Sequence, residues 1–462
     1  MDASGDPRRT PAGSGPDVEH STPSRLEVPP GAQLRGGTFV APGDKSVTHR
    51  AYLLGGLARG ETVVENRNTG ADCDSTLACL RQLGVMASVL PSGAVTITGS
   101  DMRLRAPNGV LDCGNSGTTL RLLAGILAGQ DLEATLTGDE SLRSRPVARI
   151  IEPLRRMGAR LSAEGGDRLP PLTVSGASLR PIDYALPMAS AQVASCVLLA
   201  GLQAQGTTMV RVPGPARDHT ERMLPVFGVA LDRGGPDSAG ATTTAVSGPA
   251  RLTGVRMRVP GDFSAAAFFL AGAAASPGTS VSVDHVSLNP TRTGLLDVLE
   301  RMGARVERSG EHLECGEPVG RVTVTGPDTL RAADIAPSLV PAMVDEIPAW
   351  AVAASAARGT SRVSGAGELR VKESDRLAAL ASTLGRLGVA VAEYPDGLAI
   401  TGGRIGGGEV DAAGDHRIAM ALAVIATRAS GRVSIAGAEG IPTSFPGFRD
   451  TLAALTGGAF PA

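Results

Sequence analysis

The chain has 462 residues, a formal net charge of −2 and only 3% aromatic residues. This length allows two or more domains, whereas the near-zero charge and scarce aromatics argue against partners such as nucleic acid or a membrane surface. Its five cysteines form no CxxC pair and its six histidines form no metal-binding spacing, so we expect a reducing, cytoplasmic setting and no metal or other cofactor.

Residues 1–24 are rich in proline, glycine, serine and charge, and they contain no apolar core of a signal peptide. We therefore expect a disordered tail before the globular part begins near residue 25. The richest apolar run, residues 263–275, is too short to span a bilayer.

The phrase Pro-Gly-Asp-x-Ser occurs twice, at residues 42–46 and 260–264. Each copy is followed by a small, apolar helical pattern, which predicts a turn and a helix start. The first copy carries Lys45 and Arg50, where the second carries Phe263 and Phe268. The shared frame therefore explains the local structure, and the cations of the first copy need a functional explanation.

A second repeat has two apolar residues three apart followed by glycine, which predicts a helix end with a left-handed cap. It occurs at residues 80–85, 154–159, 224–229, 299–304, 384–389 and, degraded, 452–457. Short alternating stretches after the caps predict strands, so the spacing of roughly 70 to 85 residues indicates six α/β units.

These repeats predict an α/β fold of two similar domains with three units each. We place a first, discontinuous domain at residues 25–42 plus 260–462 and a second domain at 43–259. The two Pro-Gly-Asp frames would then be paired hinge strands, and a ligand site is expected in the cleft between the domains.

Charged motifs at predicted helix starts are candidates for anion binding. Lys45, Ser46 and Arg50 lie at such a start, where free amides and the helix dipole suit a phosphate monoester. A nucleotide-binding P-loop is excluded, because Asp44 stands where it requires glycine. The glycine-rich turn that includes Gly117 also has an anion-friendly geometry.

Further candidates follow along the chain. Arg145 precedes Pro146, which we expect at the first position of a helix, and its guanidinium could form a bidentate contact with an anion. Ser190 is either a plain N-cap or a ligand, whereas Gln192 is harder to dismiss because it begins a nearly apolar helix.

The second half of the chain adds acidic and mixed motifs. Asp345 precedes the helix that contains Trp350, and residues 370–376 contain five charges. On one helix, Lys372 and Arg376 would be like-charged neighbours four residues apart, which suggests an anion between them. An Asp-His-Arg motif ending at Arg417 opens an alanine-rich helix.

Together these motifs resemble the enolpyruvyl transferase family, in its EPSP synthase branch, over about residues 25–450. The resemblance implies that each domain is an inside-out α/β barrel of three βαβαββ repeats. It also implies transfer of the enolpyruvyl group of phosphoenolpyruvate to the 5-hydroxyl of shikimate 3-phosphate, in the shikimate pathway of aromatic amino-acid biosynthesis. We expect a cytoplasmic monomer without cofactor.

The resemblance also implies residue roles. The expected shikimate 3-phosphate ligands are Lys45, Ser46, Arg50, Ser190, Gln192, Asp345 and Lys372. The expected phosphoenolpyruvate ligands are Lys45, Gly117, Arg145, Gln192, Arg376 and Arg417. Asp345, aided by Lys372, would accept the hydroxyl proton, and Lys45 would act with them. Glu373 would protonate the methylene carbon, so we expect burial beside bound anions to raise its pKa.

Two departures from the family pattern matter. The usual paired serines appear here as Ser190-Ala191, a pattern of one subgroup, and one lysine is replaced. Thr443 stands where many relatives have a lysine, which puts one phosphoenolpyruvate contact in doubt. Gly117 lies where a larger residue would crowd glyphosate, so we expect a glyphosate target.

Two rivals remain. The sibling that acts on UDP-N-acetylglucosamine uses a loop cysteine, which is missing from residues 142–144. A non-catalytic repeat scaffold would leave unexplained why only one Pro-Gly-Asp copy is cationic.

Overall fold

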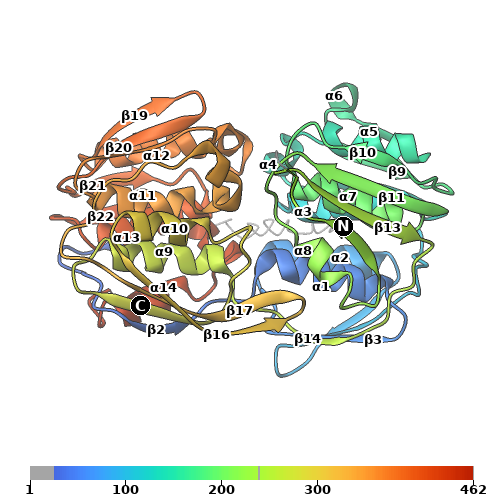
Figure 1. Cartoon of the computed structure of the whole chain (residues 1–462), viewed down its shortest axis with the longest axis horizontal. Helices are drawn as coiled ribbons and strands as arrows, with labels where there is room; N and C mark the ends of the chain where they lie inside the picture. Colours follow the sequence, from blue (N-terminus) through green and yellow to red (C-terminus); the bar gives the residue numbers. More distant parts are fainter. Residues whose placement is uncertain (1–24, 238–239, 461–462) are drawn as a thin grey trace, which may run out of the picture.

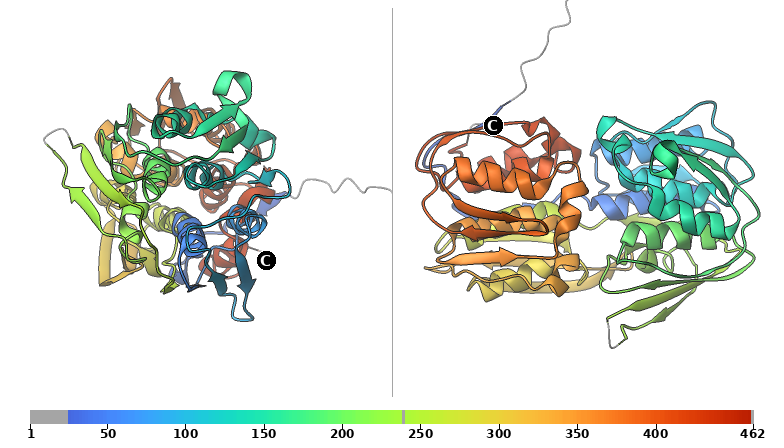
Figure 2. Two further views of the ribbon diagram at one scale, coloured as in Figure 1. Left: turned by 90° about the vertical axis from the view of Figure 1, so that its right-hand side faces the viewer. Right: turned by 90° about the horizontal axis from the view of Figure 1, so that it is seen from above.

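The computed structural model describes residues 25–237 and 240–460, so the expected tail at 1–24 lies outside the described residues. The described chain forms two lobes that lie side by side (Figures 1 and 2). The first lobe has a hydrophobic core drawn from residues 26–41 and 263–460. The core of the second lobe comes from residues 47–259, with Cys315 added. The protein therefore has the two-domain α/β architecture that the repeats predicted.

Among the described residues, each lobe contains three small sheets. Those of the first lobe are, in strand order, β1 (Leu26–Val28), β22 (Val433–Ala436) and β21 (Gly408–Asp411); β16 (Arg305–Glu314), β17 (Glu317–Thr325), β15 (Ser280–Ser287) and β2 (Gly37–Val40); and β18 (Thr360–Val363), β20 (Gly397–Thr401) and β19 (Ala390–Tyr394). Those of the second lobe are β14 (Arg256–Arg258), β3 (Glu61–Glu65), β5 (Val95–Thr98) and β4 (Met86–Val89); β6 (Leu111–Asp112), β7 (Glu133–Thr137), β9 (Leu169–Ser175) and β8 (Arg160–Ala163); and β10 (Asp183–Ala185), β11 (Gly206–Val212), β13 (Thr242–Gly248) and β12 (Leu231–Gly234).

The helices follow the same division. The first lobe contains α9 (Phe263–Ala274), α10 (Gly294–Arg301), α11 (Ile347–Ala356), α12 (Arg376–Arg386), α13 (His416–Ala426) and α14 (Phe448–Leu455), with 3-10 turns η1 (Pro337–Ala342), η2 (Val344–Glu346), η3 (Gly367–Val371) and η4 (Ala438–Thr443). The second lobe contains α1 (Lys45–Leu57), α2 (Ala71–Gln82), α3 (Gly117–Leu127), α4 (Glu140–Arg143), α5 (Ala148–Met157), α6 (Glu164–Asp167), α7 (Ala191–Gly201) and α8 (His219–Met223). Within residues 25–237 and 240–460, no helix is long and apolar enough to cross a membrane.

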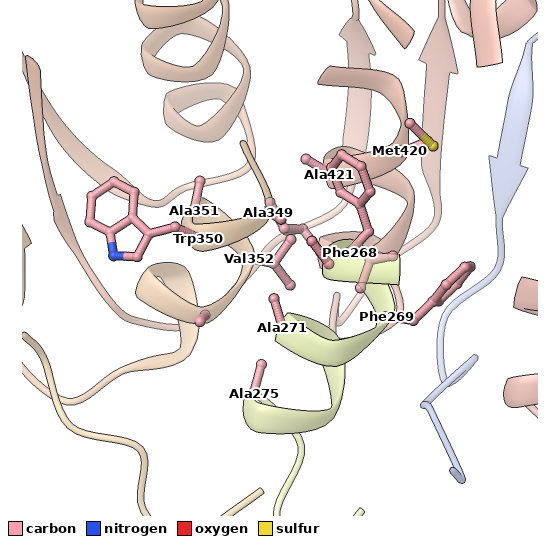
Figure 3. Packing of buried hydrophobic residues seen from close by; sticks show 14 of the residues in the cluster. Phe268, Phe269, Ala271, Ala275, Ala349, Trp350, Ala351, Val352, Met420 and Ala421 are labelled. Carbon is pink, nitrogen blue, oxygen red and sulfur yellow. The ribbon is translucent and has the colours of Figure 1, made fainter. Parts of the chain in front are cut away.

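Apolar helices fill the interior of each lobe. In the first lobe α9, α11 and α13 pack against one another, and every residue of α9 is buried (Figure 3). The apolar copy of the repeated frame therefore leads into the core of the first lobe. In the second lobe α3 packs so closely on α7 that a Cβ at Gly125 would lie 2.2 Å from the carbonyl oxygen of Cys196. Only glycine permits that approach.

Five of the six predicted helix ends are confirmed, whereas α8 already ends at Met223 and residues 224–228 form a turn. All six repeat glycines have positive φ, from +67° to +112°: Gly84, Gly158, Gly228, Gly303, Gly388 and Gly457. The first five are followed by β4, β8, β12, β16 and β19. Glycine adopts this left-handed conformation without steric cost, which explains its recurrence at these helix ends.

The two Pro-Gly-Asp frames meet where the chain crosses between the lobes. The Asp44 amide donates to the Pro260 carbonyl and the Asp262 amide to the Pro42 carbonyl, both at 2.7 Å. The Asp44 carboxylate accepts from the Val47 amide at 2.9 Å and so caps α1. Asp262 caps α9 in the same way. Both frames therefore start helices, as predicted, whereas hinge motion at this crossing stays a prediction.

Candidate active site

A cavity of about 440 Å³ lies between the lobes and is lined by residues of both. All twelve predicted site residues lie on its wall: Lys45, Ser46, Arg50, Gly117, Arg145, Ser190, Gln192, Asp345, Lys372, Glu373, Arg376 and Arg417. Thr443 is absent from the described residues that line it. Motifs more than 300 residues apart in the sequence thus form one site.

The N-terminus of α1 supplies two cations that are already held by protein groups. Lys45 forms an ion pair with the Asp72 carboxylate. Burial lowers the pKa of Lys45, but Asp72 and Glu373 outweigh it and raise the pKa overall. Arg50 is only 4% exposed, and its Nε donates to Thr220 Oγ1 at 2.7 Å. Burial lowers the Arg50 pKa to about 10, so both side chains are charged at neutral pH.

Arg145 is fixed by hydrogen bonds rather than by the proline that follows it. Its Nη2 donates to Asn115 Oδ1 at 2.6 Å and to Ser141 Oγ at 2.8 Å. The prediction that Pro146 occupies the first helical position is wrong, because α5 begins two residues later, at Ala148. The arginine therefore projects from the short loop between α4 and α5.

Gln192 and Gly117 lie together beside an arginine to which the sequence analysis gave no role. Arg121 Nη1 donates to Gln192 Oε1 at 2.8 Å, and Gln192 Nε2 donates to Thr118 Oγ1 at 3.1 Å. A Cβ at Gly117 would lie 2.6 Å from Arg121 Nη1, so a larger residue there would displace the guanidinium. Ser190 caps α7 through the Val193 amide at 3.5 Å.

Asp345, in η2, is surrounded by cations. Its Oδ2 lies 2.7 Å from Arg217 Nη1, and its Oδ1 lies 3.7 Å from Lys372 Nζ and 3.4 Å from Arg376 Nη1. Its backbone carbonyl accepts from Arg417 Nη1 at 3.0 Å. Burial acts to raise the Asp345 pKa, but these four cations hold it well below its usual value. The carboxylate is therefore ionised at neutral pH and can accept a proton.

Lys372 and Arg376 do not lie on one helix, so the predicted repulsion between helical neighbours is wrong. Helix α12 starts at Arg376 with Asp375 as N-cap, and Lys372 precedes it in a loop. Both cations instead approach Asp345.

Glu373 lies between arginines of the two lobes. Its Oε2 accepts from Arg376 Nη2 at 2.5 Å, and its Oε1 lies 3.9 Å from Arg145 Nη1. Burial acts to raise the pKa of Glu373, but Arg376, His416, Arg145 and Lys45 hold it well below its usual value. The protein's own charged groups therefore lower the pKa of Glu373, whereas we expected bound anions to raise it.

Sequence reasoning missed Arg217, which reaches Asp345 from the segment before α8, on the other lobe. It also missed Asp72, the partner of Lys45, and Asn115, the partner of Arg145. The adjoining charges of Arg217 and Asp218 were a visible signal, but they belong to no repeat or apolar helix start.

Comparisons with known proteins agree on one family. Residues 29–452 match the family model of EPSP synthase (3-phosphoshikimate 1-carboxyvinyltransferase). The chain is 48% identical to the 3-phosphoshikimate 1-carboxyvinyltransferase of Synechocystis sp., over 95% of this chain and 98% of the relative. It is 49% identical to that of Acidithiobacillus ferrooxidans, over 92% and 96%. The solved structure of EPSP synthase from Acinetobacter baumannii superposes with a TM-score of 0.82 at 41% identity, covering 93% of this chain and 97% of that one.

Proposed function

The chain belongs to the EPSP synthase family and is a transferase of the shikimate pathway, and we propose that its cleft residues transfer the carboxyvinyl group of phosphoenolpyruvate to the 5-hydroxyl of shikimate 3-phosphate. The observation that carries this assignment of residues is the convergence of cations from both lobes on one cavity. Both substrates are polyanions, and a chain of net charge −2 concentrates its positive charge there.

The shikimate 3-phosphate subsite lies against the second lobe. We place the phosphate at the α1 N-terminus, beside Lys45 and Arg50, where the helix dipole favours an anion. The contributing side chains are Lys45, Ser46, Arg50, Ser190, Gln192, Asp345 and Lys372. We add Arg217 to this group, because its guanidinium lies 2.7 Å from the Asp345 carboxylate on the wall of the same cavity.

The phosphoenolpyruvate subsite lies between the lobes. Its carboxylate and phosphate are matched by three guanidinium groups, which suit planar and tetrahedral oxyanions. The residues are Lys45, Gly117, Arg145, Gln192, Arg376 and Arg417. The 3.9 Å approach of Arg145 to Glu373 supports an interlobe position for this subsite.

The chemistry is acid–base catalysis on two positioned substrates. Glu373 gives its proton to the methylene carbon of phosphoenolpyruvate while the 5-oxygen bonds to the neighbouring carbon and Asp345 takes the hydroxyl proton. The resulting tetrahedral intermediate then loses phosphate and the methyl proton to form the product. Because cations hold the Glu373 pKa low, substrate anions must neutralise Arg376 and Arg145 before Glu373 can carry that proton.

The decisive assay is phosphate release by purified protein. Release should require both shikimate 3-phosphate and phosphoenolpyruvate, and it should be lost in Asp345→Asn but kept in Asp334→Asn, whose side chain is 62% exposed. Activity with UDP-N-acetylglucosamine in place of shikimate 3-phosphate would overturn the assignment.

We further propose that domains at 25–42 plus 260–462 and at 43–259 close on each other about the crossing, in a cytoplasmic monomer. The division of the two hydrophobic cores supports these bounds. Sedimentation of the purified protein tests the monomer.

We also propose that glyphosate competes for the phosphoenolpyruvate subsite. The tight packing at Gly117 supports this proposal, since a Cβ there would lie 2.6 Å from Arg121 Nη1 on the cavity wall. Gly117→Ala should therefore raise the glyphosate concentration needed for half inhibition, and an unchanged value would contradict the proposal.

A further inference from the structure

Three side chains outside the cleft form a cluster of metal-binding type on the sheet that contains β15, β16 and β17. His285, His312 and Glu314 each present one ligand atom, and these atoms all lie within 4.8 Å of one another. His285 Nε2 hydrogen-bonds Glu314 Oε2, and His312 Nε2 lies 3.8 Å from the same oxygen. The spacing of these residues along the chain gives no such signal, because two different strands bring them together.

Irregularities in both strands place these side chains. The register of β15 shifts between Val283 and Val286, and that of β16 shifts between Ser309 and His312. His285 has φ of +53°, a conformation uncommon for any residue other than glycine. Such backbone outliers recur at functional sites, where the surrounding structure maintains them.

We propose that His285, His312 and Glu314 bind a divalent transition-metal ion of the Zn²⁺ class. Two imidazoles and one carboxylate are a donor set suited to such ions, with a fourth position open to water. Tetrahedral bonds of about 2.0–2.1 Å separate ligand atoms by roughly 3.3–3.5 Å. The 3.8 Å separation of His312 Nε2 from Glu314 Oε2 is therefore within a small side-chain adjustment of that geometry.

His312 has a ring nitrogen that is free to bind an ion and is open to solvent. His312 Nδ1 hydrogen-bonds the Gly310 carbonyl at 3.0 Å, which places the ring proton on Nδ1 and leaves the Nε2 lone pair free. Its side chain is 54% exposed, so an ion can enter from solvent, whereas those of His285 and Glu314 are 17% and 24% exposed.

The cluster adjoins the crossing between the lobes. The His285 carbonyl accepts from the Gly261 amide at 2.7 Å, and the Ser287 amide donates to the Gly261 carbonyl at 2.9 Å. An ion that ties β15 to β16 would therefore stabilise the strand on which the second Pro-Gly-Asp frame rests. Binding to the folded state alone raises the melting temperature.

Zn²⁺ titration of the full chain, without a histidine tag, tests the proposal by calorimetry and by melting temperature. We expect one ion per chain and a higher melting temperature. His312→Ala and Glu314→Gln should each weaken binding by about 10–100-fold or more, since even losing a ligand's supporting partner costs that much. His285→Asn tests the third ligand with a residue that tolerates positive φ.

Glu311→Gln is the matched control, because Glu311 is an exposed carboxylate next to His312 but outside the cluster. It should keep the affinity of the parent. No binding, or equal binding in the parent, His312→Ala and Glu314→Gln, would overturn the proposal; equal binding would mean that the ion lies elsewhere, for example on a thiol.

Discussion

Arg292 is the shared counter-ion of the crossing between the lobes, and its replacement by methionine should destabilise the protein strongly. The side chain is 1% exposed, forms an ion pair with Asp44, and lies 3.2 Å from Asp262 Oδ1 and 3.9 Å from Glu346 Oε1. Burial lowers the Arg292 pKa, but these carboxylates outweigh it and raise the pKa overall. Arg292→Met would leave buried carboxylates of both lobes without this cation.

The expected loss follows from the burial of the network. Removing one partner of a buried ion pair costs about 3–5 kcal/mol, against a total stability of about 5–15 kcal/mol for a domain. For a cooperative unit of about 200 residues this corresponds to a fall in melting temperature of roughly 6–20 °C, measured by calorimetry. The control Arg362→Met removes an arginine that is 60% exposed and lies 3.9 Å from Asp334, and it should cost less than about 1 kcal/mol.

The pH dependence gives a second check. Burial acts to raise the Asp262 pKa, but Arg292 and Arg417 depress it overall, so this group stabilises the fold above its unfolded pKa and loses that contribution as pH falls. The difference between the parent and Arg292→Met should therefore shrink as the pH falls below about 4, the ordinary pKa of an aspartate. A melting temperature within about 2 °C of the parent at pH 7 would refute the reasoning, since about 1 kcal/mol alone shifts it that far.

Changes at Lys45 and Glu373 test the site, and a change at Glu221 tests a buried carboxyl of α8. Lys45→Met should reduce turnover by about 10²-fold or more. It should also lower the free energy of unfolding by about 1–3 kcal/mol, because buried Asp72 loses its partner. Adding Asp72→Asn should restore the melting temperature but not turnover. Glu373→Gln should lower kcat by about 10²-fold or more, whereas Asp334→Asn, at a 62% exposed side chain, should keep most activity in the phosphate-release assay. Burial raises the Glu221 pKa from 4.5 to about 7, so the parent should lose stability as the pH rises between these values. Urea unfolding at pH 4 and pH 8 should show a loss of about 3 kcal/mol in the parent and none in Glu221→Gln.

The fold was predictable where the signal is local. An aspartate before a helix and a glycine after it act within one turn of their own backbone. The helix starts at Asp44 and Asp262 and five of the six glycine caps could therefore be predicted from neighbouring residues.

The site was predictable as a set of residues but not as a network. Arg217 reaches Asp345, and Lys372 and Arg376 approach the same carboxylate, only because segments far apart in the sequence meet in space. Helix geometry assumed for residues 372–376 therefore gave the wrong relation between two correctly chosen cations. The low pKa of Glu373 likewise depends on cations from both lobes.

The reciprocal bonding of the two frames makes the second lobe an insertion whose ends meet. The chain leaves the first lobe at Pro42 and returns at Pro260. The carbonyl of each proline accepts a hydrogen bond from the aspartate amide of the other frame. Because the two ends lie side by side, a short link from residue 42 to residue 260 could join the two parts of the first lobe into one chain. The charges of the first lobe would change, however. Such a link would remove Asp44, and Arg292 would then face carboxylates of the first lobe only. The two lobes are thus separable as paths of the chain but share one charge balance.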